Sequence, residues 1–437
     1  MVSIKDLSKQ IPDPDDNGVI RDPSNDGDYG TWLGRVKDCK IKPVTKHDFF
    51  EIVNFATRMN LSDLVIQTGK PIFVNHHGEL TAITRPLGRN EVQEIMLWCT
   101  NREKITFDLE SGQDYDTAFT VPDLKERDKW GRPRQHRFRL NITACSYDGG
   151  IGYQLVSRYI SPEIPTVKSV RLEPEIVREA TPSQGGVVLL GEVGSGKTST
   201  AAALMTEVAA GRTPIRGSVL TYESPIEFDY EALPSAHVIF AQSDIPINLP
   251  SFSRGSRNSV RRKPALVNLG ELRDRDTIEA ATEMMTTGVI CISTAHANCV
   301  AAGFRRLVQK FPENLQAQAF YGLVANIHML INQRLVRHKD WTWENPKMIC
   351  LREWQVMTDD VRSQIEAAGP ERHGRVLQSI LCAPNNQHGQ SMLVTVRKFF
   401  RAGEITEDVA HRVLIAYGYH TSALMSDDEY MPVLIEE

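Results

Sequence analysis

Residues 191–198 read Gly-Glu-Val-Gly-Ser-Gly-Lys-Thr, a complete G-x-x-x-x-G-K-[ST] pattern. The apolar run 187–190 precedes it, and a helix-forming segment, 199–210, follows it. A strand that leads through a glycine-rich loop into a helix places backbone N–H groups and the positive end of the helix dipole around an anion. This context predicts a phosphate-binding loop. The candidate contact residues are Gly191, Glu192, Val193, Gly194, Ser195, Gly196, Lys197, Thr198 and Ser199.

Two side chains of this loop carry the chemistry of the pattern. Lys197 is expected to reach the β- and γ-phosphates of a nucleotide, and the Thr198 hydroxyl is expected to ligate Mg²⁺. The loop therefore predicts that the chain binds ATP or GTP together with Mg²⁺.

Downstream of the loop, strand-like and helix-like segments alternate. The expected strands are apolar runs at 186–190, 218–222, 237–240, 265–269, 288–294 and 327–332. This alternation is typical of a parallel sheet that helices cover on both faces. It predicts an α/β core over residues 181–345.

Two of the expected strands end in acidic residues. Residues 221–227 read Thr-Tyr-Glu-Ser-Pro-Ile-Glu, so Glu223 and Glu227 stand four apart across a proline turn. The apolar strand 265–269 is followed by Glu271, a Walker B arrangement in which the acid holds Mg²⁺ or activates the attacking water. Ligands of open α/β sheets bind at the carboxyl ends of the strands. Glu271, Glu227 and Glu223 are therefore candidate catalytic carboxylates, although paired surface carboxylates are also common.

The strand expected at 288–294 leads into Ala295 and His296. A lone histidine is most often structural, and that interpretation stays open from this segment alone. Because His296 follows a phosphate loop and an acidic strand end, it is also a candidate sensor of the γ-phosphate.

Five basic residues and no acidic residue fall within residues 254–263. Such a cluster could bind nucleic acid, form a solvated face or contact another subunit. No aromatic residues are interleaved for base stacking, which favours the last two interpretations.

The remaining chain divides by composition. Residues 1–45 are rich in Asp, Pro, Gly and Asn without apolar periodicity, which predicts a disordered leader. Helical and alternating patterns over 46–162 predict a small α+β module, and 163–180 is expected to be a linker. Residues 346–437 are expected to be helical and to end in an acidic tail.

Composition limits the classes of protein. The chain has 437 residues, of which 41% are hydrophobic and 24% charged, and its net charge of −5 argues against broad nucleic-acid binding. No apolar run reaches the ~18 residues that span a bilayer, and seven scattered cysteines without a C-x-x-C pair suggest reduced thiols. We expect a cytoplasmic protein without direct membrane insertion, whose membrane contact, if any, comes through partners.

Taken in order, these motifs resemble those of the PilT/GspE family of secretion and pilus ATPases. The loop looks like the family's Walker A motif, and 221–227, 268–274 and 293–298 look like its Asp box, Walker B motif and His box. Residues 137–141 and Arg158 are similar to an arginine-bearing strand pair of its PAS-like domain. Residues 333–336 resemble its QRLV segment, and the likeness spans roughly residues 46–340.

Within this family the chain most resembles the DotB/TraJ branch of type IVB secretion and conjugative plasmid transfer. A long leader, the lack of a tetracysteine motif and a divergent C-terminus carry this likeness. Ser224 stands where the Asp box usually has an aspartate, so the role of that carboxylate is lost or falls to Glu223. Lys263-Pro264-Ala265 replace the acidic residues ahead of Walker B, and the absence of an AIRNLIRE-like segment argues against a retraction motor.

The resemblance implies a RecA-like P-loop core preceded by a PAS-like α+β domain, assembled as a homohexamer with nucleotide between the two domains. It implies hydrolysis of ATP to ADP and phosphate, with Mg²⁺, coupled to rigid-body domain motion. Arg139 and Arg158 would then neutralise transition-state charge as arginine fingers do. The implied partners are inner-membrane proteins of a secretion or transfer complex.

Two other functions share these motifs. A hexameric DNA-translocating helicase or packaging ATPase has the same loop, although the overall acidity argues against it. A slow, nucleotide-gated scaffold would account for Ser224 in the Asp box. Phosphate release measured with and without single-stranded DNA separates all three.

Overall fold

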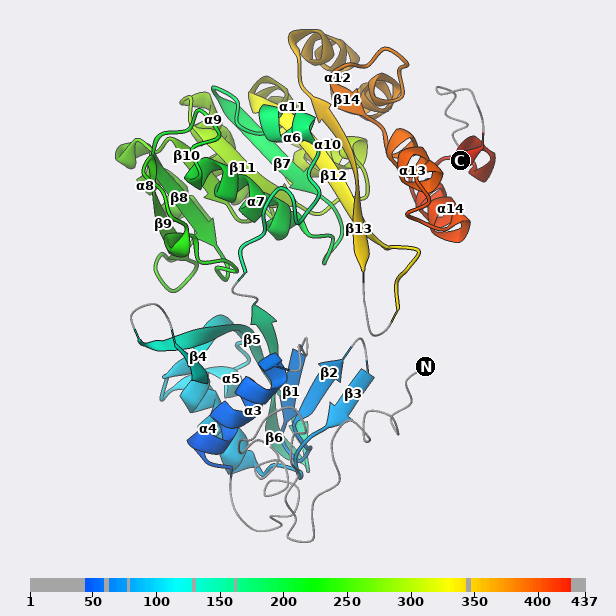
Figure 1. Cartoon of the computed structure of the whole chain (residues 1–437). Helices are drawn as coiled ribbons and strands as arrows, with labels where there is room; N and C mark the ends of the chain where they lie inside the picture. The colour runs from blue at the N-terminus through cyan, green and yellow to red at the C-terminus, as the bar shows by residue number, and fades with distance from the viewer. Residues whose placement is uncertain are drawn as a thin grey trace. The chain divides into compact units, whose positions relative to one another are not determined.

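The computed structural model describes residues 44–58, 63–76, 79–127, 131–160, 163–342 and 347–425. The expected leader, apart from its last two residues, and the acidic tail from Asp427 onward lie outside these residues. The chain divides into two compact units, Met1–Glu163 and Ile164–Glu437 (Figure 1).

The first unit is an antiparallel sheet covered by helices. Its strand order is β3-β2-β1-β6-β5-β4. The strands are β1 (Asp63–Gln67), β2 (Phe73–His76), β3 (Glu79–Ala82), β4 (Tyr115–Arg127), β5 (Pro133–Tyr147) and β6 (Gly150–Ile160). The helices are α3 (Lys46–Arg58), α4 (Arg89–Thr100) and α5 (Ile105–Glu110). Helical spacing of Phe49, Ile52, Val53 and Ala56 places one face of α3 in the core of this unit, so the expected α+β module is present.

The second unit contains an eight-stranded sheet in the order β14-β13-β12-β7-β11-β10-β8-β9. The six strands from β9 to β12 in this order are parallel, as the sequence predicted. They are β7 (Gly185–Leu190), β8 (Gly217–Glu223), β9 (Val238–Asp244), β10 (Leu266–Leu269), β11 (Ile290–Ala295) and β12 (Ile327–Arg337). Each expected strand therefore exists, with ends shifted by a few residues.

Helices cover both faces of this sheet (Figure 1). In β7, Val188 and Leu190 face one hydrophobic core while Val187 and Leu189 face the other, because successive strand residues point to opposite faces. The helices are α6 (Pro174–Glu179), α7 (Lys197–Ala209), α8 (Phe252–Arg262), α9 (Arg275–Thr286), α10 (Val300–Gln309), α11 (Glu313–Asn326) and α12 (Asp359–Leu381).

The sheet extends beyond the expected end of the core at residue 345. β13 (Met348–Val356) pairs antiparallel with β12, and β14 (Gly389–Gln390) pairs with β13. The helices α13 (Met392–Arg401) and α14 (Glu407–Ala416), with Tyr419, Ala423 and Leu424, form a separate small core against this edge. The expected linker, 163–180, also differs, because Leu172, Ile176 and Ala180 are buried in the core of the second unit.

Across the residues that the structure describes, no helix combines the length and apolarity required to cross a bilayer.

Candidate active site

The phosphate loop lies between the fully buried strand β7 and the start of α7. Gly196 caps the helix with φ 84°, a left-handed conformation that glycine adopts at little cost. Gly191 allows close packing, because a Cβ at this position would lie 2.5 Å from the Gln333 carbonyl oxygen. The loop is open to solvent at Glu192, Val193 and Gly194, while Thr198 and Ser199 in the first turn of α7 are half-buried. The expected strand, loop and helix are thus adjacent.

Lys197 is buried beneath the loop. Its Nζ donates hydrogen bonds to the carbonyl oxygens of Gly191 at 2.9 Å and Glu192 at 2.8 Å. Burial lowers the pKa of Lys197, while the nearby carboxylates of Glu271 and Glu227 raise it. The ammonium group is therefore held at the loop in a position where a phosphate could replace the carbonyl contacts.

His296 lies between Lys197 and Glu271. Its Nδ1 is 3.4 Å from the Lys197 Nζ, and its Nε2 is 3.4 Å from the Glu271 Oε1. Because an ammonium group can only donate, Nδ1 accepts and Nε2 carries the proton toward the carboxylate. Backbone contacts fix the strand ends here, with the Leu272 N–H donating to the Thr294 carbonyl at 2.7 Å. The Walker A, Walker B and His-box segments therefore meet through three side chains.

The two glutamates of the segment 221–227 occupy different environments. Glu223 is buried, and its Oε1 accepts hydrogen bonds from the Thr221 hydroxyl at 2.6 Å and from the Gln242 amide at 3.2 Å. Burial raises the pKa of Glu223 to about 7. Glu227 is half-buried, and its charge acts on Lys197. Glu227 is thus the one of the pair that is open to solvent beside the loop.

Ser224, which stands in place of the usual aspartate, donates from its hydroxyl to the Ile245 carbonyl oxygen at 2.8 Å. The contact ties the end of β8 to the segment after β9. In this chain the position has a structural contact instead of a carboxylate.

Arg139 and Arg158 belong to the first unit, and the phosphate loop belongs to the second. They lie directly opposite each other on β5 and β6. Arg139 pairs with Asp116 at 2.7 Å and Arg158 pairs with Asp63 at 2.7 Å. Both arginines thus share one face of the antiparallel sheet, and their acidic partners hold them there.

Gln333 on β12 supports the phosphate loop, a role that we did not predict. Its Nε2 donates to the Ser195 carbonyl at 2.7 Å, and its Oε1 accepts from the Thr200 hydroxyl at 2.9 Å. Gln333 is 1% exposed, so both contacts are shielded from water. The QRLV resemblance includes this glutamine, but a single polar residue in a strand carries no chemical pattern of its own.

The preceding residue, Asn332, reaches the His-box segment from the same strand. Its Nδ2 donates to the carbonyl oxygen of Ala297 at 3.0 Å, one residue after His296. Its Oδ1 accepts from the Tyr417 hydroxyl in the C-terminal region. The His-box segment and the phosphate loop are therefore both hydrogen-bonded to β12, the first through Asn332 and the second through Gln333.

The donor set fits a magnesium ion that is held partly by substrate. Among the described residues, no group of three His, Cys, Asp or Glu side chains is arranged to hold a metal by itself. Mg²⁺ usually keeps several waters and binds through one or two protein ligands plus substrate phosphates. The Thr198 hydroxyl and the Glu271 carboxylate are the ligands that the site offers.

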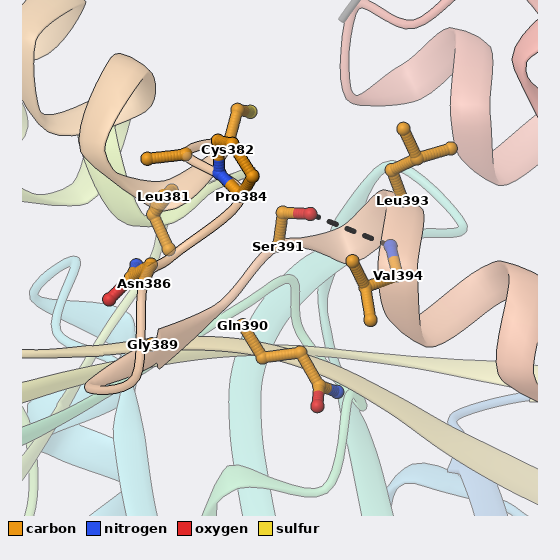
Figure 2. Close-up of a pocket in the computed structure, with 10 residues that line it drawn as sticks. Leu381, Cys382, Pro384, Asn386, Gly389, Gln390, Ser391, Leu393 and Val394 are labelled. Carbon is orange, nitrogen blue, oxygen red and sulfur yellow. Dashed lines mark hydrogen bonds between the residues drawn. The ribbon is translucent and has the colours of Figure 1, made fainter. Parts of the chain in front are cut away.

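A cavity in the C-terminal region is separate from this chemistry. Figure 2 shows Leu381 and Cys382 at the end of α12 facing Ser391 and Val394 at the start of α13. The Ser391 hydroxyl accepts from the Val394 N–H at 3.5 Å and caps α13. None of the predicted site residues lines it.

The family described as "Type II/IV secretion system protein" matches residues 160–406. Among curated proteins, the type IV pilus ATPase PilU of Pseudomonas aeruginosa is 26% identical over 295 residues, which are 67% of this chain and 71% of PilU. The type IV pilus retraction ATPase PilT of the same organism is 27% identical over 290 residues, which are 66% of this chain and 78% of PilT.

Comparison with solved structures also finds ATPases. The Legionella pneumophila ATPase DotB matches with a TM-score of 0.73 and 32% identity, covering 87% of this chain and 97% of DotB. DotB of Yersinia pseudotuberculosis matches with a TM-score of 0.72 and 29% identity, covering 85% and 94%. The retraction motor PilT with bound ADP shares the fold, with a TM-score of 0.67 and 23% identity, covering 83% and 96%. These matches confirm the expected RecA-like core and the α+β domain before it.

Proposed function

Because the chain belongs to the family of type II/IV secretion system proteins, we propose that it is the motor ATPase of a type IV secretion, conjugative-transfer or type IV pilus machine. Its relatives PilU, PilT and DotB are named ATPases, and this chain is an ATPase of the same family. The resemblance to DotB favours a secretion or transfer machine over a retracting pilus.

One observation carries the proposal. Lys197, His296 and Glu271 form a continuous set of contacts at the carboxyl ends of three adjacent parallel strands. This is the edge at which open α/β sheets bind ligands. A cation for phosphate, a carboxylate for Mg²⁺ or water, and a histidine between them are the groups that phosphoryl transfer requires.

The proposed roles follow from these positions. The loop amides of 191–199 and Lys197 bind the phosphates, and Thr198 with Glu271 holds Mg²⁺, which neutralises charge on the phosphates. Glu271 or Glu227 orients the attacking water. His296 changes partner when the γ-phosphate leaves, because Lys197 is then free to contact it.

We further propose that the protein acts as a homohexamer in the cytoplasm and is recruited to the inner membrane by secretion or transfer proteins. In a hexamer, Arg139 and Arg158 from the first unit would supply positive charge to a nucleotide bound by the second. The support is the resemblance of these arginines to the family's pattern and the division of the chain into two units.

Steady-state phosphate release from the full-length protein tests this function. We expect Mg²⁺-dependent turnover in wild type, no turnover in Lys197→Ala, and no stimulation by single-stranded DNA. Stimulation of several-fold or more by DNA would identify a DNA translocase instead. Tight ATP binding with only trace turnover would identify a nucleotide-gated scaffold.

A further inference from the structure

A second compartment lies directly behind the Glu271–His296 pair. It is a cavity of about 120 Å³ between the ends of β10 and β11 and the helix α10. One water needs only roughly 10–15 Å³, so the cavity holds more than a single solvent molecule. Its lining residues are Glu271, Leu272, Arg273, Ala295, His296, Gly303, Arg306, Leu307 and Lys310.

The wall opposite the catalytic pair is cationic. Arg306 and Lys310 stand four residues apart on one face of α10 and its C-cap. Like charges at this spacing repel each other on a helix, although the helix C-terminus favours cations. Arg273 also lines the cavity, but its Nε lies 3.3 Å from the Asp274 Oδ2, so its charge is partly balanced. Within the described ranges, neither Arg306 nor Lys310 is paired with a carboxylate. An anion between them would remove the repulsion.

His296 belongs to both compartments. Its Nδ1 faces Lys197 of the phosphate loop, while the same ring lines the cavity with Glu271. The imidazole of His296 therefore lies between the phosphate loop and the cavity.

We propose that the cavity binds the inorganic phosphate produced by hydrolysis and is the route by which it leaves the site. This inference rests on the proposed ATPase function. In the reaction, the water oxygen forms a bond to the γ-phosphorus, and the β–γ bridging oxygen leaves with the electron pair on ADP. One water proton goes to solvent and the other stays on the phosphate. The product is a small dianion, which matches the charge of the two cationic side chains Arg306 and Lys310.

The cavity is selective for a small anion. Leu272, Ala295, Gly303 and Leu307 form the apolar remainder of the lining, and no amide or hydroxyl side chain lines the cavity. The negative Glu271 also disfavours a strongly charged anion close to it, which directs the phosphate toward Arg306 and Lys310.

Phosphate titration into the ADP-loaded full-length protein tests the site, at constant ionic strength and with inorganic phosphate as the probe. We expect Arg306→Ala and Lys310→Ala each to weaken phosphate binding by about tenfold or more, as expected for a charge-assisted hydrogen bond. Arg306→Lys should retain most of the affinity. Arg305→Ala is the matched control, because Arg305 is exposed on the same helix but does not line the cavity.

A single-turnover assay separates cleavage from release. Acid quenching counts all cleaved phosphate, and a fluorescent phosphate-binding protein counts only free phosphate. We expect Arg306→Ala to lower the affinity for phosphate by a larger factor than it lowers the rate of ATP cleavage in the first turnover. Wild-type affinity in both alanine variants, or undetectable phosphate binding to wild type, would overturn the inference. So would a variant that loses cleavage but keeps its phosphate affinity.

The two proposals fail in distinguishable ways. If the wild-type protein cleaves no ATP, the proposed function is wrong. The titration still decides the cavity in that case, because it requires no turnover.

Discussion

In the proposed mechanism, Glu271 is the residue on which hydrolysis depends most directly. It is the acid after β10, and its Oε1 lies 3.4 Å from the His296 Nε2. Glu271→Gln removes the charge and keeps the volume, so we expect ATP binding within a few-fold of wild type and a turnover reduced by about 10²-fold or more. ATP-trapped protein should accumulate, which nucleotide analysis after gel filtration will detect.

Glu223→Gln and Glu227→Gln are the comparison variants for Glu271→Gln. Both make the same chemical change, but Glu223 is buried and already hydrogen-bonded inside the sheet. Wild-type turnover in Glu271→Gln together with a loss in Glu227→Gln would assign the base to Glu227.

At the residue scale, the sequence predicts the functional side chains that belong to a short, recognisable motif. Lys197 follows from its loop, and Glu271 and His296 follow from their positions after apolar strands. Gln333 could not be found this way. Its partner, Ser195, is 138 residues away, and a glutamine in an apolar strand differs from a surface residue only once the sheet is formed.

β12 is the element that supports the phosphate loop. Gln333→Glu removes the donor that holds the Ser195 carbonyl and places a carboxylate beside the phosphates. We expect the affinity for an ATP analogue to fall by about tenfold, and the free energy of unfolding to fall by about 1–3 kcal/mol, because a buried carbonyl loses its donor.

Gln318→Glu on the exposed surface of α11 is the control, because it adds the same charge away from the loop. A thermal-shift titration with an ATP analogue measures both variants. Equal analogue affinity for both would show that Gln333 has no part in shaping the loop.

The strand β13 was not predicted from the sequence, and its composition explains why. Its centre contains Arg352 and Glu353, which read as surface charges in the sequence but are both 0% exposed. The Arg352 guanidinium donates to the carbonyl oxygens of Val170 at 2.9 Å and Arg171 at 3.1 Å. The carbonyl groups that bind this buried guanidinium therefore come from the expected linker. Neither β13 nor this segment can be recognised as buried from its own sequence, because the burial of each depends on contacts with the other.

Glu353 makes folding dependent on pH. Burial raises its pKa to about 7, although its Oε1 accepts a hydrogen bond from the Val300 N–H at 2.6 Å. Its Oε2 has no hydrogen-bond partner among the described residues. The nearby titratable groups, Cys299, Cys382, Tyr417 and Tyr419, all have raised pKa values and stay neutral near pH 7. The folded state thus binds more protons than the unfolded state between about pH 4.5 and 7, and this contribution to stability falls as pH rises.

Glu353→Gln removes that dependence. We expect the free energy of unfolding of the variant, relative to wild type, to rise by about 3 kcal/mol between pH 4.5 and 7 and to be flat above pH 7. Urea unfolding at several pH values measures the difference. Glu313→Gln, an exposed carboxylate on α11, should show no such rise. A pH-independent difference for Glu353→Gln would mean that its carboxyl is ionised throughout this range.

At the scale of the whole molecule, the main prediction concerns the assembly of several copies of the chain. The two proposed arginine fingers, Arg139 and Arg158, belong to one unit and the phosphate loop belongs to the other. We expect homohexamers with Mg²⁺ and an ATP analogue, measured as mass by light scattering. A strictly monomeric mass at micromolar concentration with saturating analogue would contradict this.

The helix α8 is the surface that we assign to this assembly. Its buried face carries Phe252, Gly255, Ser256 and Ser259, while Arg257 and Arg261 are exposed one turn apart on the other face. Reversing both arginines to Glu should therefore leave the fold intact and weaken hexamer formation or turnover without any DNA present. Lys398→Glu with Arg401→Glu on α13 makes the same change in charge and is the control. Contacts that follow a DNA backbone would instead weaken steeply with salt. If the α8 variant assembles and hydrolyses ATP normally but loses a measurable DNA affinity, the helix is a nucleic-acid contact.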